Sequence, residues 1–220
     1  MSTQSNEVIV NAGCLMFFQG VPGCRDILDS TLYAQLSASK KYSRFTDYPR
    51  WQQTWLKSAR RFGWKLLASE SYEQAVPCLQ AGNLWDWVSA LCPSSVDPAL
   101  LDNCRVALSR CSIEQAGFTL LADQVLGRGA MTLSLQVGLV AEDGTLVLLQ
   151  IHFDHDCPMD ASKLFGAWSS KAVKGNIVMS VHRLQLSEDI YGPLRMAFAM
   201  ALREHRHDLV CPLFAPGQAA

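Results

Sequence analysis

Two strongly apolar runs between Met131 and Asp154 have the pattern of extended chain, with a period of two in the first, and predict a pair of β-strands. The strands, at 131–142 and 145–154, flank Asp143-Gly144, a dipeptide typical of a tight hairpin turn because glycine readily adopts positive φ. The second strand is apolar on both faces, so we expect it to lie centrally in its sheet. On the first strand we expect an apolar face of Leu133, Leu135, Val137 and Leu139. The other face, with Thr132, Ser134, Gln136 and Gly138, is expected to be wetter.

The first half of the chain has a helical period instead. Leucines at 28, 32 and 36 lie four residues apart and predict a helix over about 26–42. A second helix is expected to start at Thr46 or Asp47, with Pro49 in its first turn, and to stop at Gly63. One side of this helix is a narrow apolar stripe of Trp51, Trp55, Ala59 and Phe62. The nearly opposite side is basic and consists of Arg50, Lys57 and Arg61.

The remaining pattern predicts an α+β fold. We expect an edge strand with a turn in residues 1–24, a strand at 64–72 and further helices around 77–93 and from 97 onward, followed by an apolar segment at 118–126 that stops at Gly127. A strand at 176–186, a long helix from 187 to about 205 and a closing strand at 209–214 complete the pattern. Residues 1–220 would then form one domain, helix-rich over 25–127 and sheet-rich over 130–214. The sheet is expected to be antiparallel.

Composition narrows the class of protein. With 49% hydrophobic and 18% charged residues, the 220-residue chain can bury one substantial core and is not globally disordered. No apolar run reaches the roughly 18–20 residues of a membrane span, and no basic segment followed by an apolar one opens the chain, so we expect a cytoplasmic protein, with non-classical secretion left open. The eight cysteines form no CxxC pair, which favours buried thiols over disulfides or a zinc site.

Charge is unevenly distributed along the chain. The net charge is −1, but residues 40–65 hold eight lysines and arginines against one acid, so this window is +7 and the remainder −8. Aromatic residues are interleaved with these cations, a mixture that can grip phosphates, lie on an anionic membrane or contact an acidic protein. A solvated face above a buried stripe gives the same pattern. The binding surface predicted on this basis consists of Arg50, Lys57, Arg60, Arg61, Trp51 and Trp55.

Potentially reactive side chains gather at the end of the hairpin. His152 and Asp154 would share one face of the strand and could bind a metal ion if the strand curls near Asp154. Cys157 beside His155 could supply a thiolate and a base. Neither pattern is complete, and the chain lacks GxSxG, GxxxxGK[ST], GxGxxG and HExxH.

The sequence therefore favours a non-enzymatic binding or interaction protein, with a protein partner or a small apolar ligand preferred over a membrane surface or nucleic acid. A small hydrolase or transferase that uses residues 152–157 is the alternative. The sequence identifies no cofactor.

Two segments resemble a group of uncharacterised bacterial proteins. Residues 26–64 read as a leucine-rich helix followed by a tryptophan-bearing helix that ends in Gly-Trp, and residues 188–202, EDIYGPLRMAFAMAL, form a late helix that begins with a tyrosine. The resemblance covers about a third of the chain. It implies a bacterial source and transfers no catalytic residue.

Overall fold

The computed structural model describes residues 7–18, 25–75, 82–91, 96, 98–112, 114–159, 162, 164–168 and 172–214. The helices are α1 (Arg25–Ser39), α2 (Tyr48–Arg61), α3 (Leu84–Leu91), α4 (Pro98–Ser109), α5 (Ala116–Val125), α6 (Glu188–Tyr191), α7 (Arg195–Ala201) and α8 (Arg203–Leu209), with 3-10 helices η2 (Arg128–Ala130) and η5 (Gly192–Leu194). The strands are β1 (Glu7–Asn11), β2 (Cys14–Phe18), β3 (Trp64–Ala75), β4 (Gly82–Asn83), β5 (Thr132–Val140), β6 (Thr145–His155), β7 (Ala167–Trp168), β8 (Val173–Leu186) and β9 (Val210–Pro212). Within these ranges every helix is too short or too polar to cross a lipid bilayer.

A seven-stranded sheet in the order β3-β8-β6-β5-β2-β1-β9 organises the α+β fold. The predicted hairpin is confirmed: β5 and β6 pair antiparallel, and Gly144 has a φ of 76° in the turn between them. The central position predicted for the second hairpin strand is confirmed too, because β6 lies between β5 and β8. The sheet is mixed rather than antiparallel throughout, since β2 and β5 run parallel.

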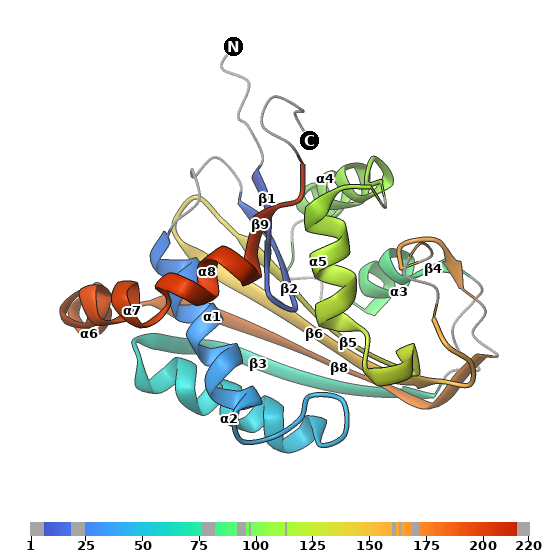
Figure 1. The fold of residues 1–220 in the computed structure, drawn as a ribbon, viewed down its shortest axis with the longest axis horizontal. Coiled ribbons are helices and arrows are strands. Elements are labelled where there is room, and N and C mark those ends of the chain that lie inside the picture. The colour runs from blue at the N-terminus through green and yellow to red at the C-terminus, as the bar shows by residue number, and fades with distance from the viewer. Residues whose placement is uncertain are drawn as a thin grey trace, which may run out of the picture.

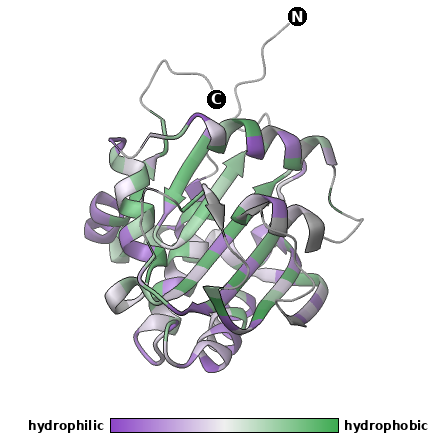
Figure 2. Cartoon of the chain, turned by 90° about the vertical axis from the view of Figure 1, so that its right-hand side faces the viewer, coloured by the Kyte–Doolittle hydropathy of each residue, from purple (hydrophilic) through white to green (hydrophobic). Residues whose placement is uncertain are grey.

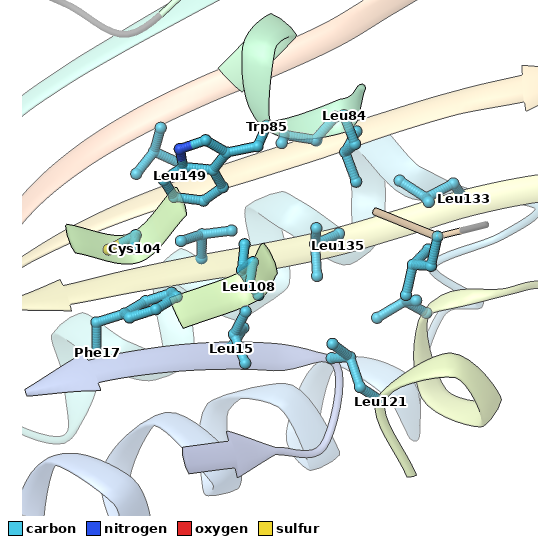
Figure 3. Packing of buried hydrophobic residues seen from close by; sticks show 14 of the residues in the cluster. Leu15, Phe17, Leu84, Trp85, Cys104, Leu108, Leu121, Leu133, Leu135 and Leu149 are labelled. Carbon is cyan, nitrogen blue, oxygen red and sulfur yellow. The ribbon is translucent and has the colours of Figure 1, made fainter. Parts of the chain in front are cut away.

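Helices cover both faces of the sheet (Figure 1). Alternate residues of each strand contribute to two separate clusters, so that Leu149 and Ile151 of β6 pack with α3, α4 and α5, whereas Leu146 and Leu148 pack with α1 and α2. Figure 3 shows the first cluster, in which labelled side chains of β2, β5 and β6 lie against those of the three helices. The strands at the centre are accordingly mostly hydrophobic in Figure 2.

The expectation of a wetter face on the first hairpin strand is wrong. Ser134 and Gln136 are each 2% exposed, because the layer of α1 and α2 covers the face that they share. Gly138 lies on the same face, and a Cβ there would approach the sulfur of Met16 to 2.4 Å. A side chain at this position would therefore displace the Met16 side chain from its place between β2 and β5.

Strands from the N-terminal half also enter the sheet. The edge strand predicted in residues 1–24 is instead the hairpin of β1 and β2, which pairs with β9 on one side and β5 on the other. The strand predicted at 64–72 is confirmed as β3, whose twelve residues form the opposite edge of the sheet. Residues 19–24, 76–81 and 215–220 lie outside the described part of the chain, as do Cys24, Cys78 and Cys92.

The single long helix predicted near the C-terminus is wrong as well. The segment is divided into α6, η5, α7 and α8, with Pro193 in η5. Proline lacks the backbone N–H that a continuous α-helix needs, which accounts for the 3-10 turn at residues 192–194, and a second interruption at Leu202 separates α7 from α8. Two arginines attach these helices to α1: Arg195 binds Asp26, and Arg206 binds the buried Asp29.

Candidate functional site

The sequence of α2 determines which of its sides is buried. The helix begins after Asp47, as predicted, although the Asp47 side chain makes no capping hydrogen bond, and Pro49 lies in the first turn. Trp51 and Trp55 are both 0% exposed and pack with α1 and with Leu146, Leu148 and Leu184 of the sheet. The indole N–H of Trp51 donates to the Ser39 hydroxyl at 2.9 Å, which links α2 to the end of α1.

Burial of the two tryptophans corrects the predicted binding surface. Trp51 and Trp55 cannot contact a partner in the folded protein, because the α1 and sheet layers enclose them completely. The exposed residues of the predicted surface are Arg50, Lys57, Arg60 and Arg61, which remain available to a partner. At 100° per residue, Arg50, Lys57 and Arg61 fall within about 40° of one another, and Arg60 lies to one side.

The exposed cations of α2 are largely uncompensated. Arg50 lies 3.4 Å from the Asp47 carboxylate, whereas no carboxylate of the described residues forms an ion pair with Lys57, Arg60 or Arg61. Arg50 and Arg61 also lie over the aromatic rings of Tyr42 and Phe62, at 5.9 and 5.5 Å from the ring centroids. We call Arg50, Lys57, Arg60 and Arg61 the basic face of α2.

One cation of the +7 window does not belong to this surface. Arg44 is buried and donates a hydrogen bond to the backbone carbonyl of Gln124 in α5. Burial lowers the pKa of its guanidinium to about 10, which still leaves it charged at neutral pH. Arg44 therefore joins two helical layers and does not face solvent.

A pocket of about 570 Å³ opens beside the first turn of α2. Phe45, Tyr48 and Gln52 line it from the side of α2, and His152 and Asp154 line it from β6. A bulge in the pairing of β6 with β8 forms another wall of the pocket. The register shifts between His152 and Asp154, so that β8 has more residues than β6 over this stretch. One of these β8 residues is Gly175, which has a φ of 69° and lines the pocket.

The rings of Tyr48 and His152 stack inside this pocket. Their centroids are 4.3 Å apart and their planes differ by 4°. Burial lowers the pKa of His152, and the nearby Asp154 only partly opposes this shift, so the imidazole is neutral at neutral pH. Its Nδ1 atom is buried and has no hydrogen-bond partner among the described residues.

Within the described part of the chain, no third ligand completes the metal site predicted at His152 and Asp154. The two side chains line the same pocket, as their shared strand face predicts, and β6 is distorted near Asp154. Asp154 accepts a hydrogen bond of 2.7 Å from the Thr132 hydroxyl. Among the described residues, the group of three that brings metal-binding atoms together is a different one, His155, Asp156 and Cys157.

The geometry of Cys157 and His155 is not that of a nucleophile and its base. The two are close, with Sγ and Nδ1 3.5 Å apart, but Nδ1 also lies 2.7 Å from the Cys157 carbonyl oxygen. A carbonyl can only accept, so Nδ1 carries the proton and cannot take another from the thiol. Asp156 hydrogen-bonds the thiol and raises the pKa of Cys157, which opposes formation of the thiolate.

A buried polar network continues from the pocket into the layer between α2 and the sheet. Gln52 donates to Gln150 at 3.0 Å and also contacts the Ser180 hydroxyl, and His182 lies between Gln150 and Ser69 at 3.3 and 2.9 Å. Burial lowers the pKa of His182 to about 4, so this ring is neutral at neutral pH. The network fixes the side of α2 opposite to the basic face.

Sequence reasoning missed part of the pocket. Tyr48 and Gln52 lie four residues apart on the buried side of α2, so extension of the helical pattern by one turn would have found them. Lys174 and Asn176 carry no local signal, because they reach the pocket only through the pairing of β8 with β6.

Comparisons with known proteins identify no family. No family model and no curated protein matches the chain. Among solved structures, a protein titled delta-endotoxin is similar, with a TM-score of 0.43 and 9% sequence identity over 80% of this chain and 82% of that one. A similarity at this level supports no conclusion about function.

Proposed function

We propose that the protein is a non-enzymatic binding protein that docks the basic face of α2 on an acidic surface of a protein partner. The observation that carries the proposal is a stripe of exposed cations, three of which pair with no carboxylate of the described residues, on a helix fixed to the core by two buried tryptophans. A rigid helix presents its charges without the entropic cost of ordering a loop, which favours binding.

Burial of Trp51 and Trp55 favours a protein partner over the two other polyanions that the sequence allows. Proteins that bind single-stranded nucleic acid stack bases on exposed aromatic rings, and interfacial helices insert such rings into the membrane. The two tryptophans of α2 can do neither. What remains exposed is positive charge, which complements a carboxylate-rich surface.

The pocket supports the proposal as a place for an apolar anchor of the same partner. It adjoins the first turn of α2, where Pro49, which precedes Arg50 in the chain, is part of its lining. Phe45, Tyr48 and Val178 give it apolar walls. Interfaces commonly combine one buried apolar side chain with a charged rim, and this arrangement supplies both parts.

Charge reversal tests the basic face. The triple variant Arg50→Glu, Lys57→Glu, Arg61→Glu is expected to bind a fluorescently labelled glutamate-rich peptide at least about tenfold more weakly than the unaltered protein at low salt, because three attractive contacts become repulsive. Fluorescence anisotropy gives the dissociation constants. Added salt should weaken the binding of the unaltered protein, since the charges involved are exposed.

The control changes the same charge elsewhere. Arg105, Arg110 and Arg203 are exposed on α4, on the turn after it and on α8, and their reversal to glutamate should leave peptide binding nearly unchanged. Equal losses in both triple variants would contradict the proposal. So would tighter, variant-sensitive binding of a single-stranded oligonucleotide or of anionic lipid vesicles, because the preferred partner would then not be a protein.

The pocket is tested with a second peptide that carries one added phenylalanine. We expect it to bind roughly tenfold more tightly, since burial of a phenylalanine side chain contributes about 1.5–3 kcal/mol before ordering costs. Thr46→Trp, at an exposed position that lines the pocket, should abolish this gain and leave the glutamate-only peptide unaffected. Ser109→Trp, exposed on α4 on the other face of the sheet, is the control; a gain that survives Thr46→Trp would exclude the pocket as the anchor site.

A further inference from the structure

The chain changes direction where β6 ends, and three potential metal ligands follow one another there. His155 is the last residue of β6, and Asp156 and Cys157 form the bend after it. His155 is buried to 9% exposure, whereas Asp156 and Cys157 are exposed. The group thus offers one nitrogen, one oxygen and one sulfur atom at a place that an ion can reach from solvent.

The ligand atoms have separations suited to one small ion. The Nδ1 atom of His155 lies 3.5 Å from Sγ of Cys157 and 3.7 Å from the Oδ1 atom of Asp156, and all three atoms lie within 4.8 Å of one another. A tetrahedral zinc ion with ordinary bond lengths requires about 3.6 Å between its nitrogen and sulfur ligands and about 3.4 Å between nitrogen and oxygen. The two separations from Nδ1 are within about 0.3 Å of these values, and the exposed Asp156 side chain can rotate to adjust its distance from Sγ.

The backbone holds these residues in place from two sides. The His155 amide donates to the Met131 carbonyl at 2.7 Å, and the Asp156 amide donates to the Ala172 carbonyl at 2.8 Å. Beyond the bend, the Met159 amide donates to the Ala130 carbonyl at 2.7 Å. Because these bonds fix the backbone before any ion arrives, little conformational entropy is lost on binding.

From this geometry we propose that His155, Asp156 and Cys157 form a binding site for a divalent transition-metal ion of the zinc type. Imidazole and thiolate select such an ion over calcium or magnesium, which prefer oxygen ligands only. Three protein ligands leave a fourth position of the tetrahedron for water. The site is independent of the basic face of α2.

Binding requires that the thiol lose its proton and that the imidazole change tautomer. The thiol proton, which the hydrogen bond to Asp156 holds, leaves to solvent, and the ion binds the resulting thiolate. The proton on Nδ1 of His155, which points to the Cys157 carbonyl, also leaves to solvent while Nε2 takes one up, so the ion binds Nδ1 of a neutral ring. The carbonyl that loses its donor belongs to an exposed residue and can be hydrated, so the exchange leaves no buried group unsatisfied.

Cobalt(II) is the probe for this site, because tetrahedral thiolate coordination gives intense visible and near-ultraviolet absorption bands. The full chain, purified without a histidine tag and under reducing conditions, should bind one equivalent of cobalt(II), and zinc(II) should displace it. Cys157→Ser should abolish the sulfur-to-cobalt band, and Asp156→Asn should weaken binding by at least about tenfold, the scale on which even outer-shell ligand partners act.

Cys211→Ser removes a half-buried thiol from β9 and serves as the matched control, with an unchanged cobalt spectrum expected. Circular dichroism checks that Cys157→Ser, at an exposed position, remains folded. The absence of a thiolate band in the unaltered protein, or a band that persists in Cys157→Ser, would overturn the proposal.

Discussion

Trp55→Ala is expected to lower the free energy of unfolding by about 3–5 kcal/mol, because a fully buried indole between α2 and the sheet would be replaced by a cavity. Urea denaturation measures the change. Trp55→Phe should cost much less, since the ring remains and the Trp55 N–H has no hydrogen-bond partner to lose among the described residues. Lys57→Ala, two residues away on the exposed face, should change stability by less than about 0.5 kcal/mol.

Trp55→Ala also shows whether Trp55 is part of the buried core or of the binding surface. If Trp55→Ala left stability unchanged and weakened binding of the glutamate-rich peptide, the aromatic stripe would be part of the binding surface. Loss of stability together with nearly unchanged binding by the remaining folded protein is the result expected from burial.

Arg206→Ala is expected to cost about 3–5 kcal/mol in the free energy of unfolding at neutral pH. Arg206 donates two hydrogen bonds to the Asp29 carboxylate, from Nε at 2.5 Å and from a terminal nitrogen at 2.8 Å, and the Asp29 side chain is only 4% exposed. Removal of the arginine leaves a buried carboxylate without its principal partner. Urea denaturation of the variant and of the unaltered protein gives the difference.

The pH dependence identifies the cause of this loss. Burial raises the pKa of Asp29 above its ordinary value, and Arg206 opposes the rise, so the variant should raise this pKa further. A carboxyl with a raised pKa in the folded state binds its proton more readily there than in the unfolded chain, so its penalty is small at acid pH and grows as pH rises through that pKa. The double variant Arg206→Met, Asp29→Leu should recover most of the stability at pH 7. A loss in Arg206→Ala that is independent of pH would show that the packing of the arginine, and not its charge, stabilises α8.

Local patterns predicted the parts of the fold that depend on neighbouring residues. The Asp143-Gly144 hairpin and the ends of α2 follow from turn chemistry and helical period, and both are confirmed. The parallel pairing of β2 with β5 joins residues more than a hundred positions apart, and the pattern of either strand contains no information about it. Pro193 was a local signal for the break in the C-terminal helical segment, and the expectation of one long helix did not use it.

The candidate site was predictable to a similar extent. The helical period separates the basic face of α2 from its tryptophans, but it does not show how completely α1 and the sheet cover Trp51 and Trp55. The shared face of His152 and Asp154 follows from the strand period, whereas the pocket around them depends on a bulge between β6 and β8. The approach of His155 to Cys157 depends on the bend after β6, where no periodicity applies.

The basic face of α2 is tested most directly by nuclear magnetic resonance of the arginine side chains as the glutamate-rich peptide is added. We predict that the Nε–H signals of Arg50 and Arg61 shift with the peptide concentration and saturate together, and that those of Arg105 and Arg110, exposed on the α4 side of the sheet, stay in place. Equal shifts at all exposed arginines, or shifts only at arginines outside α2, would contradict the proposal that this helix is the binding surface.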